Sequence, residues 1–181
     1  MIEEKALCAA MKAAWRGTGY EVYAAEDTLV ITTDEMGVEM SRRNVSRKVL
    51  SLLALLALHL GEIPDGTAYS VRKDDVQQEM LDVAMSHWDG VRNRVDGAER
   101  RTLRRTPMSW KHRGVWQEEG TGTVHTFDEG LANIIVAEPD GIEIADGLMA
   151  CDDGGGLAVI YPAEGVMAEA VRNLLEQVTL A

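Results

Sequence analysis

The chain has 181 residues, 46% of them hydrophobic and 27% charged, so it can bury a core and is not disordered throughout. Its formal net charge of −12 argues against a general DNA-binding domain, because such domains usually carry a positive net charge. Cys8 and Cys151 are the only cysteines, which excludes a disulfide framework and a four-cysteine zinc site.

The start of the sequence, MIEEKALCAAMKAAW, lacks the basic and apolar regions of a secretory signal. The most apolar run, residues 49–60, is much shorter than the roughly 20 residues of a membrane span. We therefore expect a protein of the cytoplasm that does not enter a membrane and keeps both thiols reduced.

The first elements in chain order are a helix and three short strands. Residues 2–16 carry apolar side chains at helical spacing, and Gly17 follows them. Residues 20–25 and 28–33 are rich in strand-forming residues and flank Glu26-Asp27, which predicts a tight hairpin. Residues 38–41 are predicted to form the third strand.

The central helix is predicted over residues 44–60, NVSRKVLSLLALLALHL. Asn44 is a suitable N-cap, Gly61 a suitable C′ residue, and Pro64 prevents continuation. Because residues 49–60 are apolar at nearly every position, we expect a helix that is buried on almost all sides. A fourth strand is predicted at residues 67–72.

A second long helix is predicted over residues 74–95. Val76, Met80, Val83, His87 and Val91 recur on one face at nearly heptad spacing. Such a narrow face packs either on the central helix or on a second copy of the chain, which leaves a homodimer open.

The last third is predicted to contain short strands at residues 132–137, 142–145, 148–151 and 157–161, and a helix at about 164–178. A shift of 119 residues places Asp27 over Asp146, Leu29 over Leu148 and Gly37 over Gly156. Two related strand-strand-strand-helix units and chance similarity of short hairpins are both compatible with this match.

These elements predict an α+β fold with short antiparallel strands, an N-terminal helix, a buried central helix, a long second helix and a C-terminal helix. The predicted division is an N-terminal lobe at residues 1–95 and a β-rich lobe at 96–181, which could also form one compact domain.

Charge is unevenly distributed along the chain. Residues 92–113 contain eight Lys/Arg and two acids, whereas residues 114–181 contain 13 acids and one base. The segment 99–117 interleaves these cations with tryptophans, as nucleic-acid-binding segments do. The alternative is a hairpin whose arginines pair with the acidic third while its tryptophans join the core. The candidate binding residues in this basic strip are Arg100, Arg101, Arg104, Arg105, Lys111 and Arg113.

A second basic cluster lies around the start of the central helix. Arg42, Arg43, Arg47 and Lys48, together with free backbone N–H groups, would make an anion site. The alternative is that nearby carboxylates such as Glu39 neutralise these cations.

The acidic third offers a candidate face for a basic partner. The residues proposed for it are Asp140, Glu143, Asp146, Asp152 and Asp153. Spaced carboxylates can imitate phosphates and steer association with a basic groove. They can equally be ordinary solvated loop residues.

Catalytic signatures are not found in the sequence, and no cofactor or metal is expected. His125, Asp128 and Glu129 with Asp152 and Asp153 are the only candidates for a metal-dependent enzyme, but no ligand spacing makes them converge. The glycine-rich stretch at 152–156 lacks the Lys-Ser/Thr of a phosphate-binding loop.

Two stretches, EKALCAAMKAAWRGTGYEV (3–22) and SRKVLSLLALLALHLGEIP (46–64), resemble small proteins of phages and mobile elements, among them anti-CRISPR proteins. That resemblance implies a non-catalytic inhibitor that binds a type II RNA-guided nuclease, its guide or its target DNA. It is compatible with the charge map, because such nucleases hold nucleic acid in basic channels. The alternatives are a phage accessory protein that binds nucleic acid without a nuclease target, and a metal-dependent enzyme.

Overall fold

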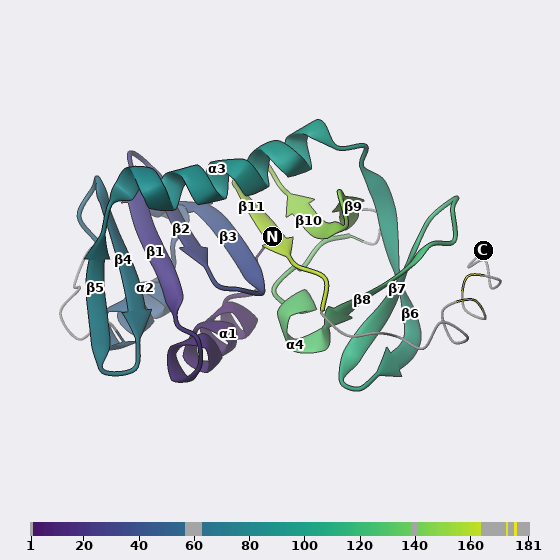
Figure 1. Cartoon of the computed structure of the whole chain (residues 1–181), viewed down its shortest axis with the longest axis horizontal. Coiled ribbons are helices and arrows are strands. Elements are labelled where there is room, and N and C mark those ends of the chain that lie inside the picture. The colour runs from purple at the N-terminus through teal and green to yellow at the C-terminus, as the bar shows by residue number, and fades with distance from the viewer. Residues whose placement is uncertain (1, 57–62, 139–140, 164–172, 174–175, 177–181) are drawn as a thin grey trace.

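The computed structural model describes residues 2–56, 63–138, 141–163, 173 and 176. Its central feature is one antiparallel sheet of 11 strands in the order β5-β4-β1-β2-β3-β11-β10-β9-β6-β7-β8 (Figure 1). The strands are β1 (Tyr20–Ala25), β2 (Thr28–Thr32), β3 (Met36–Ser41), β4 (Thr67–Arg72), β5 (Asp75–Glu79), β6 (Arg101–Trp110), β7 (Arg113–Glu118), β8 (Val124–Asp128), β9 (Glu143–Ala145), β10 (Leu148–Asp152) and β11 (Gly156–Ile160).

Helices cover both faces of the sheet. The helices are α1 (Glu4–Arg16), the 3₁₀ turn η1 (Arg42–Asn44), α2 (Arg47–Leu56), α3 (Leu81–Gly97) and α4 (Glu129–Ala132). Buried residues of α1, α2 and α4 share one hydrophobic core, and those of α3 belong to a second. Along β1 and β2, side chains alternate between the two cores, as the twofold period of a strand requires.

The strands of the N-terminal part, β1 to β5, and those of the C-terminal part, β6 to β11, meet in the middle of the sheet, where β3 pairs with β11. Val38 faces Ala158 and Glu39 faces Leu157 in this register. The 119-residue shift relates Val38 to Leu157 and Glu39 to Ala158, so the matched positions pair crosswise. The two hairpins therefore meet about a local twofold axis that passes between residues 38 and 39.

Helix α3 runs across the sheet over this central pair (Figure 1). The Trp88 indole Nε1 donates to Glu39 Oε2 at 2.6 Å, and Arg92 forms an ion pair with the other Glu39 oxygen at 2.6 Å. The Trp88 ring occupies the space where a side chain at Gly37 would stand. A glycine on β3 is therefore what allows the helix to approach the sheet closely.

Much of the local structure agrees with the sequence prediction. The first helix, the hairpin β1–β2 and the strand β4 form where they were expected. Glu26 has a φ of 53° in the hairpin turn, a left-handed conformation that short turns between strands use.

The predicted helix-rich α+β class is wrong, because the fold is dominated by a single sheet of 11 strands. The central helix is not buried on all sides, since α2 lies outside the sheet and Leu55 is 69% exposed. Ser46, and not Asn44, caps α2 through its side chain, which accepts from the Val49 N–H at 3.3 Å. Gly61 and the predicted C-terminal helix lie largely outside the described residues.

The second long helix was also predicted to begin too early in the chain, at residue 74. Residues 75–79 form the edge strand β5, and α3 begins at Leu81. Its buried residues are Ala84, Trp88, Val91 and Val95, whereas Val83, on the predicted face, is 65% exposed. The predicted strand at 132–137 is replaced by α4 and a turn. The lobe division at residue 95 falls near the end of α3 and stays a prediction.

Gly37→Ala is expected to lower the free energy of unfolding by about 1–3 kcal/mol, because the new methyl group overlaps the Trp88 ring. Thermal melting followed by circular dichroism measures this loss. Gly90→Ala is the matched control, since Gly90 lies inside α3 with open space around it. That control is expected to raise stability by about 0.5–1 kcal/mol. Equal melting temperatures for Gly37→Ala and wild type would contradict the close packing of α3 on β3.

Candidate interaction surfaces

The basic strip forms the hairpin β6–β7, which β8 extends. Pro107 lies in an irregularity of β6 between Arg105 and Ser109, a position where a strand tolerates proline. The Trp116 side chain is buried, and Trp110 packs with Val115 and Val124 in a small separate cluster. The tryptophans are thus largely engaged in packing.

The arginines of the strip pair with carboxylates of the same chain. Arg100 contacts Glu143 at 3.2 Å and Asp96 at 3.1 Å, and Arg105 contacts Glu129 at 3.4 Å. Arg101 is paired with Glu99 and Glu118, and Arg104 with Glu119. These contacts match the hairpin alternative, in which the arginines neutralise the acidic third. Nucleic-acid binding by the strip stays a prediction.

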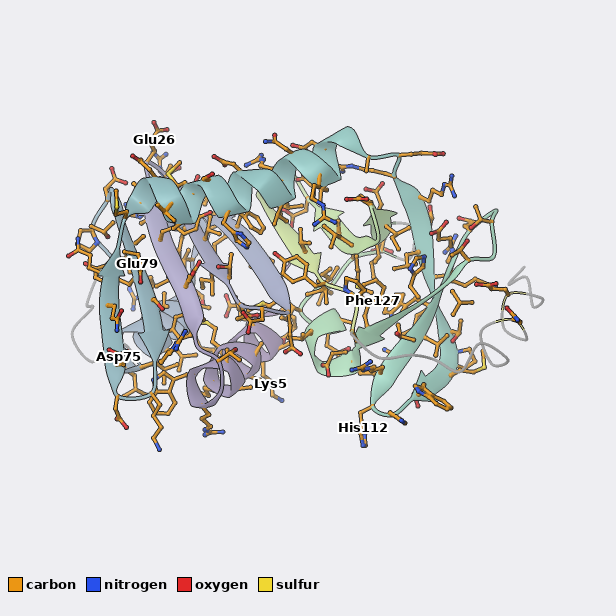
Figure 2. The ribbon with its side chains drawn as sticks, in the orientation of Figure 1. Lys5, Glu26, Asp75, Glu79, His112 and Phe127 are labelled. Carbon is orange, nitrogen blue, oxygen red and sulfur yellow. The ribbon has the colours of Figure 1, made fainter. Side chains whose placement is uncertain are left out.

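Lys111 and Arg113 lie at the turn of the hairpin. The Lys111 ammonium is 5.7 Å from the centre of the Trp110 ring, and Arg113 donates to the carbonyl of Ala163 at 3.3 Å. Lys111 and His112 both have positive φ in this exposed turn, where His112 is labelled in Figure 2.

Glu118 is the most connected carboxylate of this region. It is 11% exposed and lies 2.7 Å from His125 Nε2, and it accepts from Thr121 at 2.8 Å and from Arg101 at 3.2 Å. Burial raises the pKa of Glu118, but the hydrogen bonds from His125, Thr121 and Arg101 outweigh it and leave the pKa below its ordinary value.

The basic cluster at the start of α2 separates into two pairs of residues. Arg42 donates to the Ile63 carbonyl at 2.7 Å and contacts Asp65, and Arg43 contacts Asp27 at 3.2 Å. Arg47 and Lys48 are exposed and form no ion pair with the described residues. Carboxylates therefore neutralise half of the cluster, but they are Asp65 and Asp27. Glu39, the carboxylate expected there, binds Trp88 and Arg92 of α3 instead.

The acidic face predicted from the sequence is also partly engaged. Glu143 pairs with Arg100, and Asp146 pairs with Arg94 at 2.7 Å. Asp152 and Asp153 accept from backbone N–H groups in their own loop, those of Gly154 and Gly155. Asp140 lies outside the described residues. A role for these residues in partner binding stays a prediction.

Another group of acidic residues lies at the edge of the sheet. These residues were not identified as a candidate binding surface from the sequence. Strand β5 pairs only with β4 among the described strands. Exposed carboxylates along it and at the start of α3 have no cationic partner in the described part of the chain; they are Asp74, Asp75, Glu79 and Asp82. Figure 2 shows Asp75 and Glu79 on this outer strand. Met80 and Val83, 71% and 65% exposed, follow directly. We call these six residues the β5 edge.

A groove of about 1,040 Å³ lies between α1 and α4. Its α1 side is made of alanines such as Ala10 and Ala14, and Leu131 and Tyr161 add apolar surface. Arg113 and Asp128 bring polar groups to it, but Arg113 is held by Ala163 and Asp128 caps α4.

The candidate residues for metal or nucleophilic chemistry are dispersed. His125 contacts Glu118, Asp128 accepts from the Leu131 N–H, and Glu129 pairs with Arg105. No group of three or more His, Cys, Asp or Glu in the described part of the chain is placed to hold a metal. Burial raises the pKa of both Cys8 and Cys151, which leaves each thiol a weak nucleophile.

The described helices include none that is both long enough and apolar enough to span a membrane.

Glu118→Gln is expected to flatten the fall in stability at acid pH. The folded-state pKa of Glu118 lies below its unfolded value, so its contribution is full above the unfolded pKa of about 4.3 and is lost as pH falls through the folded pKa. Melting temperatures of both proteins between about pH 7 and pH 3 measure this. An acid dependence unchanged by the substitution would contradict the role given to the Glu118 contacts.

No protein-family model and no curated protein sequence matches the chain. Among solved structures it is similar to DNA polymerase III, beta chain, from Streptococcus pneumoniae TIGR4, at 8% identity and a TM-score of 0.36. The match covers 94% of this chain and 66% of that one, just under two thirds of its length. A likeness this distant carries no argument about function.

Proposed function

We propose that the chain is a non-catalytic interaction protein of the host cytoplasm that binds a nucleic-acid enzyme through the β5 edge. In its sharpest form, which follows the resemblance to anti-CRISPR proteins, the partner is a type II RNA-guided nuclease. The observation that carries the proposal is the β5 edge itself, where an outer strand, unpaired carboxylates and exposed apolar side chains lie together.

The physical argument is one of complementarity. An outer strand offers backbone N–H and C=O groups to a partner, and nearby acids protect it from pairing with other copies. Four carboxylates without cationic partners favour a basic partner and speed its approach at low salt. Met80 and Val83 supply apolar area that a partner can exclude from water.

The dispersion of the candidate catalytic groups supports a binding role over an enzymatic one. Each of His125, Asp128 and Glu129 has a structural partner, and each cysteine is buried. The described surface therefore supports a role in partner binding more than a role in catalysis.

Co-purification with a type II nuclease, alone and with guide RNA, followed by a DNA cleavage assay, tests the proposal. We expect the variant D74N/D75N/E79Q/D82N to raise the half-inhibitory concentration at least about tenfold, because interfacial charge pairs are lost. The matched control E26Q/D34N/E35Q/E138Q removes four exposed acids outside the β5 edge and is expected to inhibit like wild type.

A second variant, M80S/V83S, tests the apolar part of the β5 edge without changing charge. We expect it to weaken binding while leaving the melting temperature near that of wild type, since both side chains are exposed. Wild-type protein that neither binds nor inhibits the nuclease would remove this partner. Equal losses in the two acid variants would remove the β5 edge as the interface.

A further inference from the structure

Among the described residues, the largest group of exposed cations without an ion-pair partner is not in the basic strip. Arg72 and Lys73 at the β4–β5 turn and Lys111 in the β6–β7 turn are also exposed and form no ion pair with the described residues, but they are fewer. Most arginines from η1 onward have carboxylate partners, as described above. The cations on the outer sides of α1 and α2 form no ion pair with any described residue; they are Lys5, Lys12, Arg16, Arg47 and Lys48. We call these five residues the helical cationic face.

The spacing along α1 places its three cations in one row. Lys5, Lys12 and Arg16 are seven and four residues apart, which keeps them within about 40° around a helix. All three are exposed, while Leu7, Cys8 and Met11 face the core. Figure 2 shows Lys5 on α1, on the far side of the sheet from α3. The row spans about 16 Å at 1.5 Å per residue.

The start of α2 adds to the same side of the molecule. Helices α1 and α2 contact one another and share the core that lies opposite α3. Cys8 of α1 lies within electrostatic reach of both Lys12 and Lys48, which places charges from the two helices near each other. Glu3 and Glu4 are the nearby acids, and the side chain of Glu3 is used to cap α1. The two helices and the α1 N-cap thus carry five cations against two acids, on a chain with a net charge of −12. Asp34 and Glu35 line the groove beside Ala9 and Ala13 and bound this surface on one side.

From this arrangement we propose that the helical cationic face binds the phosphate backbone of double-stranded DNA without sequence specificity. Each strand of duplex DNA carries about one charge per 3.4 Å of helix axis, so the α1 row alone spans roughly five phosphates of one strand. Between its cations the row carries Ala9 and Ala13, which are exposed and small enough to let a backbone approach. No large apolar side chain lies in the α1 row, and on α2 Leu55, seven residues after Lys48 and 69% exposed, is the one exposed large apolar side chain. A single such side chain is less than the apolar face that insertion into an anionic membrane requires.

Binding is expected to be weak and dependent on salt. Five phosphate contacts give a slope of about −4.5 in a plot of log K against log salt concentration. The negative charge elsewhere on the chain keeps affinity in the range of non-specific binding, with a Kd of roughly 10⁻⁴ to 10⁻⁶ M. This surface shares no residue with the β5 edge, and its binding does not depend on a nuclease partner.

Fluorescence anisotropy of a labelled duplex of roughly 24 base pairs, titrated with the full chain between about 25 and 150 mM KCl, tests the proposal. For the variant K12Q/R47Q/K48Q we expect a slope reduced by about three and an affinity at least about tenfold lower at the lowest salt. The control R94Q/R104Q/K111Q removes three cations from other surfaces and is expected to stay within about twofold of wild type.

Three outcomes would overturn the proposal. The first is no anisotropy change for wild type at the lowest salt. The second is an equal loss in the two variants, which would indicate a general charge effect. The third is binding to phosphatidylglycerol vesicles with the same variant dependence and no binding to DNA, which would assign the surface to membranes. Melting curves that match wild type show that each variant is folded.

Discussion

The pairing of β3 with β11 is the constraint on which the rest of the structure depends. It joins strands separated by more than a hundred residues, and it connects the two parts of the sheet into one. Gly37 and Gly156, related by the 119-residue shift, both serve this centre: Gly37 makes room for Trp88, and Gly156 lets β11 approach the Glu39 carbonyl. Glu39 then binds α3 through Trp88 and Arg92. Glu39 and Gly37 thus set how α3 lies on the sheet, and Gly156 allows β11 to pair with β3.

The sequence was sufficient to predict those elements whose position depends on neighbouring residues alone. The hairpin β1–β2 follows from strand-forming residues around Glu26-Asp27, and β4 from alternation after a Pro-Asp-Gly turn. Strand β5 was missed because Asp75–Glu79 is polar at nearly every position, as edge strands in contact with water often are. The α2 helix was taken as central because it is apolar, but a sheet packed on both faces makes the strands the core.

The candidate surfaces could be located in the sequence only in part, because side-chain pairing depends on tertiary contacts. A count of charges identifies residues 92–113 as basic, yet it does not show that Glu143, Glu129 and Glu118, from other parts of the chain, pair with those arginines. Conversely, the cations of α1 do not stand out in residues 1–91, which hold 9 Lys/Arg against 15 acids. They become distinct only in the structure, which shows that they have no ion-pair partner among the described residues. Ion pairing between side chains, more than charge composition, decides where electrostatic potential remains on the surface.

The separation of the two unpaired charge groups has a consequence for how they can act. At physiological ionic strength the Debye length is about 8 Å, so exposed charges on different elements influence one another little. The two groups come close at one point, where the Lys73 N–H, next to Asp74, donates to the carbonyl of Trp15, next to Arg16, at 3.0 Å. Their other members lie on different elements, where screening limits cancellation. A chain with a net charge of −12 can therefore offer an acidic surface to a basic partner and a separate basic surface to a polyanion. Both surfaces lie in the N-terminal half of the chain. In the C-terminal half, most of the described cations are neutralised by ion pairs.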